Sequence, residues 1–157
     1  MPIRISSFIR GSNDKLLSAG FLLLRLTAGG ILFVAGSGKV FGWFGGYGLE
    51  LTIKMFVSHM GISAFWATVS SLTEMIGGVL FIIGFLTRPA AFAVTINMAV
   101  AAYVSLPRGF LAGAAYPFTI MIISLVLLIA GPMLLSIDAI LFRSSAARDP
   151  IPPGSGQ

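Results

Sequence analysis

The sequence has no cysteine and only one histidine, which limits the redox chemistry that the chain can perform. Without cysteine there is no disulfide, no thiol redox motif and no thiolate ligand for an iron–sulfur cluster. The single histidine, His59, excludes a haem held by two histidines of one subunit, and no nearby second ligand supports a metal site. We therefore expect no metal and no covalently bound cofactor, so any electron transfer requires a quinone or a partner protein.

Charge is also scarce. Only 10% of the 157 residues are charged and 57% are hydrophobic, whereas soluble domains carry about 25% charge. The net charge of +5 does not indicate nucleic-acid binding, because the ten lysines and arginines are scattered singly. The apolar runs are continuous and about 20 residues long, which is typical of membrane-spanning helices and not of β-barrel strands. The sequence predicts an all-α protein embedded in a lipid bilayer.

Four apolar runs predict an integral membrane four-helix bundle. Their approximate limits are residues 16–34, 64–86, 89–106 and 116–135. The first run is too long for a signal peptide and carries a charge, so we interpret it as an uncleaved span. We expect a lead over residues 1–15, a four-helix domain over residues 16–143, and a disordered tail over residues 144–157 that is rich in proline, glycine and serine.

A short amphipathic helix is expected between spans one and two. Leu49, Ile53 and Met60 recur at helical spacing, while Glu50 and Lys54 form an i,i+4 pair in the favourable order. An aromatic, glycine-rich loop precedes it. This pattern predicts a helix at the membrane interface.

The loop charges predict the orientation. Four spans put both termini on one side, and that side carries six basic residues against three on the other. Under the positive-inside rule, both termini lie in the cytoplasm of a multi-pass protein of the bacterial inner (plasma) membrane.

Two charges of opposite sign fall inside the apolar runs. Arg25 lies in the first and Glu74 in the second, and Asn97 is near the middle of the third. At about 1.5 Å per residue, all three lie at similar depth. A charge at the bilayer centre costs at least about 2.5–3.5 kcal/mol and usually has a partner or a function. We expect these residues to form an intramembrane polar pocket, which either binds a quinone or serves as a structural ion pair.

Several short segments resemble the DoxX family of small four-span bacterial membrane proteins. They are Leu23-Leu24-Arg25-Leu26, Gly38-Lys39-Val40-Phe41-Gly42, Glu74-Met75-Ile76-Gly77-Gly78, Gly84-Phe85-Leu86-Thr87-Arg88-Pro89, and Gly131-Pro132 with Ser136-Ile137-Asp138-Ala139. The resemblance covers roughly residues 16–142. The positions that match the family pattern include Lys39, Gly77, Gly78, Thr87 and Arg88.

The resemblance implies an inner-membrane protein associated with oxidoreductases, whose relatives include a subunit of a thiosulfate:quinone oxidoreductase. Two positions depart from the family pattern. Ser105 stands where members often have histidine, and Ala115 where many have glutamate. Proton-coupled chemistry that depends on those two groups is therefore in doubt here.

These observations lead to one functional expectation and two alternatives. The expectation is an accessory or quinone-facing membrane subunit of an oxidoreductase system, without a redox centre of its own and with a membrane or periplasmic protein partner. The alternatives are a non-enzymatic assembly or partner-binding protein and, with less support, a small oligomeric transporter. The substrate, the electron acceptor and the oligomeric state are not determined by the sequence.

Overall fold

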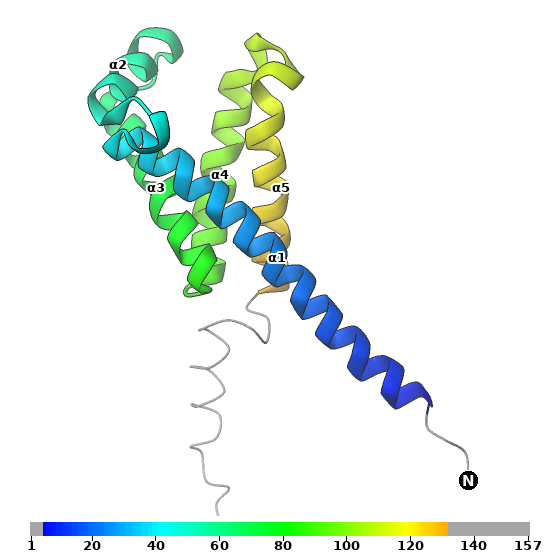
Figure 1. Ribbon diagram of the computed structural model, residues 1–157. Helices are drawn as coiled ribbons and strands as arrows, with labels where there is room; N and C mark the ends of the chain where they lie inside the picture. Colours follow the sequence, from blue (N-terminus) through cyan, green and yellow to red (C-terminus); the bar gives the residue numbers. More distant parts are fainter. Residues whose placement is uncertain (1–4, 132–157) are drawn as a thin grey trace, which may run out of the picture.

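The computed structural model describes residues 5–131, with side chains from residue 16 onward, and this part of the chain is helical without strands. The elements are α1 (Ile5–Phe41), η1 (Trp43–Gly45), α2 (Gly48–Met60), α3 (Ala64–Ile83), α4 (Thr87–Ser105), η2 (Leu106–Arg108), η3 (Phe110–Ala114) and α5 (Ala115–Ala130) (Figure 1). Four segments in α1, α3, α4 and the η3–α5 region are long and apolar enough to cross a membrane. The predicted all-α membrane bundle is confirmed, and a short helix, α2, lies between spans one and two.

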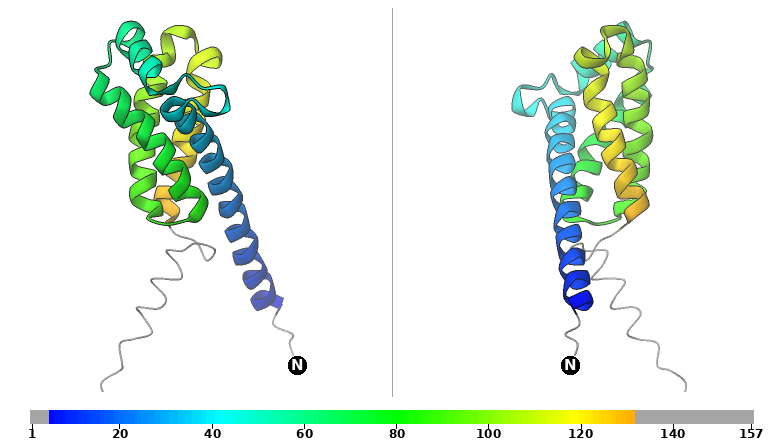
Figure 2. Two further views of the ribbon diagram at one scale, coloured as in Figure 1. Left: turned by 60° about the vertical axis from the view of Figure 1, so that its left-hand side comes forward. Right: turned by 90° about the vertical axis from the view of Figure 1, so that its right-hand side faces the viewer.

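The bundle has two distinct ends. α3, α4 and α5 run alternately up and down, and α1 crosses them obliquely with its N-terminal half extending beyond the bundle (Figures 1 and 2). α2 lies at one end, which we call the α2 end. The short link of residues 84–86 between α3 and α4 lies at the other, which we call the turn end.

Glycines with positive φ follow three of the helices. Gly61 (φ 65°) after α2 and Gly84 (φ 67°) after α3 are in the left-handed helical conformation. Gly131 (φ 70°, ψ −168°) follows α5. Residues 132–135 of the predicted last span lie outside the described residues, as do the DoxX-like segment Ser136-Ile137-Asp138-Ala139 and the predicted tail.

Small residues bring α1 and α3 into backbone contact. A Cβ at Gly29 would lie 2.9 Å from the Gly78 carbonyl oxygen, and a Cβ at Gly78 would lie 2.5 Å from the Phe33 nitrogen. Gly36 likewise faces the backbone of Met75. Lipid chains are as apolar as side chains, so close packing of this kind, and not hydrophobicity, holds membrane helices together.

Candidate functional site

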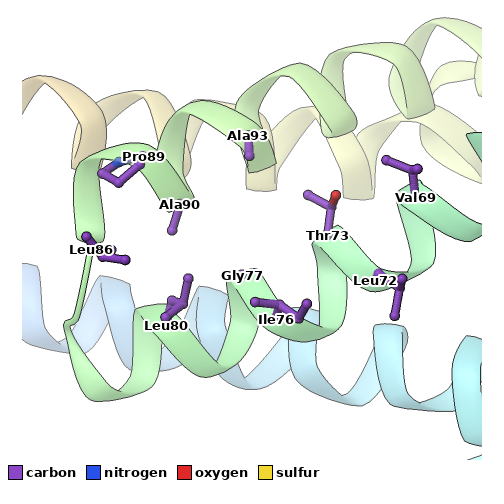
Figure 3. Close-up of a pocket in the computed structure, with 10 residues that line it drawn as sticks. All are labelled: Val69, Leu72, Thr73, Ile76, Gly77, Leu80, Leu86, Pro89, Ala90 and Ala93. Atoms are coloured by element: carbon purple, nitrogen blue, oxygen red, sulfur yellow. The ribbon is translucent and has the colours of Figure 1, made fainter.

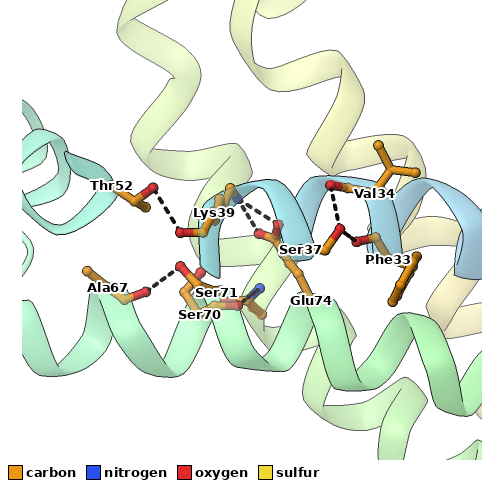
Figure 4. A network of polar contacts seen from close by, with 10 residues as sticks. Phe33, Val34, Ser37, Lys39, Thr52, Ala67, Ser70, Ser71 and Glu74 are labelled. Carbon is orange, nitrogen blue, oxygen red and sulfur yellow. Dashed lines mark hydrogen bonds and ion pairs between the residues drawn. The ribbon is translucent and has the colours of Figure 1, made fainter. Parts of the chain in front are cut away.

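A buried ion pair joins α1 to α3. The Lys39 ammonium nitrogen lies 2.6 Å from both carboxylate oxygens of Glu74 (Figure 4). The Glu74 side chain is 2% exposed, whereas that of Lys39 is 30% exposed. A carboxylate so deep among apolar helices needs such a partner, because a charge buried alone is costly.

The direction of the two helices explains why these side chains meet. Side chains on an α-helix lean toward its N-terminus. The glycine contacts show that α1 and α3 are antiparallel, since Gly29 faces Gly78 while Gly36 faces Met75. Lys39 therefore leans toward the turn end and Glu74 toward the α2 end, so the two converge.

Arg25 does not contact Glu74, contrary to the predicted pair. Its guanidinium lies against the C-terminus of α3, where a Cβ on Gly84 would be 2.5 Å from Nη1. Gly84 is ten residues beyond Glu74, about 15 Å along the helix. The predicted similar depth is wrong: Gly36 faces Met75 and Gly29 faces Phe81 and Ile82, so Arg25, one turn before Gly29, lies level with the C-terminus of α3. Arg25 is buried, and a cation is favourable at a helix C-terminus.

Asn97 lies on the other side of α3 from this seam. Its amide nitrogen donates to the Ser70 carbonyl oxygen at 3.5 Å, which is the long limit of a hydrogen bond and joins α4 to α3. The three residues predicted to share one pocket are thus distributed over three places: Glu74 faces α1, Arg25 faces the turn end and Asn97 faces α3 from α4.

The family-motif residues occupy structural positions. Gly77 and Gly78 face α4 and α1 respectively, and a Cβ on Gly77 would lie 2.6 Å from a methyl group of Val94. Thr87 is buried at the start of α4. The Arg88 guanidinium lies against Gly131 at the end of α5, in the way that Arg25 lies against α3.

α2 covers the ion pair at its end of the bundle. The Thr52 hydroxyl, which is buried, donates to the Lys39 carbonyl oxygen at 3.3 Å. The Lys39 ammonium lies 5.8 Å from the centre of the Phe56 ring, within the range of a cation–π interaction. From α5, Tyr116 is close enough to Glu74 for the two to interact electrostatically.

A groove of about 390 Å³ runs between α3 and α4 on the face of α3 away from the ion pair (Figure 3). Its lining residues are Val69, Leu72, Thr73, Ile76, Gly77, Leu80, Leu86, Pro89, Ala90 and Ala93. Thr73 supplies the hydroxyl in this lining, and Asn97 follows Ala93 by one turn of α4. The groove is therefore apolar, with Thr73 as the polar side chain of its lining.

Comparison with known proteins identifies the family. The DoxX family model matches residues 20–107, which include Arg25, Lys39, Glu74 and Asn97. The chain belongs to the DoxX family. This DoxX protein is 34% identical over 132 residues to a Bacillus subtilis (strain 168) protein named "Putative oxidoreductase CatD", an alignment that covers 83% of this chain and 92% of that relative. No solved structure matches the chain.

The two departures from the family pattern lie toward the α2 end of the bundle. Ser105 is buried at the end of α4, and its hydroxyl accepts a hydrogen bond from Arg108 at 2.8 Å. Ala115 opens α5. No group of three or more histidine, cysteine, aspartate or glutamate residues that could hold a metal occurs between residues 5 and 131.

Lys39, predicted only as a position that matches the DoxX pattern, is the partner of Glu74. The direction of the side chains could have predicted this pair. On antiparallel helices side chains lean in opposite directions, which brings a cation near the end of α1 to an anion deeper in α3. The α3–α4 groove had no such signal, because it depends on how the two helices pack.

Proposed function

We propose that this DoxX protein is an accessory, quinone-facing membrane subunit of an oxidoreductase system and has no redox centre of its own. It would reside in the bacterial inner membrane with both termini in the cytoplasm. The observation that carries the proposal is the apolar groove between α3 and α4, whose lining includes the hydroxyl group of Thr73. The oxidoreductase name of the B. subtilis relative agrees with it.

The groove fits the chemistry of a quinone. Membrane quinones combine an apolar chain with a head group whose carbonyl oxygens accept hydrogen bonds, and they would supply electron-accepting chemistry when bound. Ala90, Ala93 and Leu80 would contact the chain. The Thr73 hydroxyl and the Asn97 amide, whose present hydrogen bond is long, would donate to the head group.

A filled groove tests the proposal. The purified protein in lipid nanodiscs should bind a short-chain ubiquinone or menaquinone analogue on titration. Ala93→Phe places a ring in the groove and should weaken binding about tenfold, a change of about 1.4 kcal/mol. Ala99→Phe is the matched control, because Ala99 is also exposed on α4 but does not line the groove.

Three results would overturn the proposal. They are reproducible absence of co-purified quinone together with no binding on titration, equal binding by the two phenylalanine variants, and binding that persists at full strength in Ala93→Phe.

A second candidate is a non-enzymatic assembly protein that docks a membrane or periplasmic partner through α2. The observation in its favour is the exposed apolar surface of α2 and the preceding loop, where Leu51, Val57, Phe44 and Tyr47 are 48–69% exposed. Site-specific crosslinking from Val57 should then capture a defined partner, while crosslinking from Ala99 should not. A transporter has less support, because the backbone contact of Gly29 with Gly78 closes the α1–α3 seam on the turn-end side of the ion pair.

A further inference from the structure

The surroundings of the Lys39–Glu74 pair differ between its two sides. Toward the α2 end, the buried hydroxyl groups of Ser71 and Thr52 lie on α3 and α2, and Lys39 itself is 30% exposed. Figure 4 shows these side chains together with Lys39 and Glu74 where α1, α2 and α3 meet. Polar side chains of α1, α2 and α3 thus gather on the α2 side of Glu74.

Toward the turn end, the seam is apolar and closed. Ala28, Leu32 and Phe81 are fully buried there, and Gly29 and Gly78 are in backbone contact. This packing leaves no room for a Cβ atom, and therefore none for water. Water therefore cannot approach Glu74 along this seam from the turn end.

α2 covers that approach and has glycine at both boundaries. It contacts Lys39 through two side chains, the Thr52 hydroxyl at 3.3 Å and the Phe56 ring at 5.8 Å. Gly48 (φ 73°) starts the helix and Gly61 (φ 65°) follows it, both in the left-handed region that favours glycine. Thr52 and Phe56 are therefore the side chains through which α2 covers Lys39.

We propose that the Lys39–Glu74 pair is a polar site that water and protons reach from the α2 end only, and that the packing of Thr52 and Phe56 of α2 over Lys39 controls this access. The site would exchange with the compartment on one side of the membrane. This inference does not depend on quinone binding, because the groove lies on the opposite face of α3.

Cysteine labelling tests the proposal directly, since the chain has no cysteine of its own. Ser71→Cys and Ala28→Cys place single thiols at fully buried small residues on the two sides of the pair. The probe is a charged methanethiosulfonate reagent added to the protein in nanodiscs. We expect Ser71→Cys to react slowly and Ala28→Cys to remain unlabelled.

Loosening the cover should then change one rate and not the other. Phe56→Ala should raise the labelling rate of Ser71→Cys about tenfold, which corresponds to about 1.4 kcal/mol in the opening equilibrium. Val57→Ala, on the exposed face of α2, is the control and should leave the rate unchanged. Thr52→Val, which removes the hydrogen bond to Lys39 while keeping the side-chain shape, should also raise the rate and decides the matter if Phe56→Ala does not fold.

The proposal is overturned by any of three outcomes. The first is labelling of Ala28→Cys as fast as that of Ser71→Cys. The second is no labelling of Ser71→Cys in any background. The third is that Phe56→Ala and Thr52→Val accelerate labelling no more than Val57→Ala does. Quinone titration of the same variants separates this test from the proposed function, because loosened α2 should leave quinone affinity unchanged.

Discussion

Replacing Lys39 should lower the free energy of unfolding more than replacing Glu74 does. Lys39→Met leaves the Glu74 carboxylate, 2% exposed, without its partner among apolar helices. Glu74→Gln leaves Lys39, which is 30% exposed and can extend its ammonium group toward the α2 end. Removing one member of a buried pair costs about 3–5 kcal/mol. We expect Lys39→Met to reach this range and Glu74→Gln to fall below it.

A double-mutant cycle measures the interaction itself. The variant with both substitutions has no unpaired charge, so it should be more stable than the sum of the single changes predicts, by about 1–3 kcal/mol. The matched control is the cycle of Arg25→Met with Glu74→Gln. These sites are about 15 Å apart along α3, so their effects should add to within about 0.5 kcal/mol.

Unfolding in mixed detergent micelles provides the assay, followed by the fluorescence of the chain's two tryptophans, Trp43 and Trp66. The reasoning is refuted if Glu74→Gln is more destabilising than Lys39→Met, if the Lys39–Glu74 cycle is additive, or if Arg25 and Glu74 show the stronger coupling.

Two further predictions concern packing and the surface. Gly78→Ala should cost about 1–3 kcal/mol in the same assay through overpacking against α1, whereas Gly30→Ala, with no atom within 4 Å of the new Cβ, should cost nothing measurable. The hydrogen bond from Lys54 lowers the pKa of Glu50 from its ordinary 4.5, so this pair supports α2 above that value and loses the support as the pH falls through the lowered pKa. Both side chains are exposed, so Glu50→Gln should leave the melting temperature unchanged by circular dichroism; a clear drop would show that the pair holds α2 in place.

The elements could be predicted because their signals are local. Runs of about 20 apolar residues, and glycines such as Gly61 at helix ends, placed α2 and α3 within a few residues of their observed limits. Contacts between helices depend on more than depth. Arg25 and Glu74 have similar depths when residues are counted from the ends of the apolar runs, but α1 begins far before its apolar run and its register against α3 places Arg25 near Gly84. The lateral spacing of α3 and α4, which creates the groove, is not encoded in either helix alone.

The positions of the charges also indicate which face of α3 is free for function. α1 holds α3 at two points: Lys39 binds Glu74 in its middle, and Arg25 lies against its C-terminus at Gly84. Between them, the contact of Gly29 with Gly78 brings the two backbones together. A seam fixed by an ion pair, a buried guanidinium against the helix end and backbone contact cannot open to admit a lipid-soluble ligand without losing all three. The residues that line the groove on the opposite face of α3 form no such ion pair or backbone contact, so a ligand entering from the bilayer should bind there.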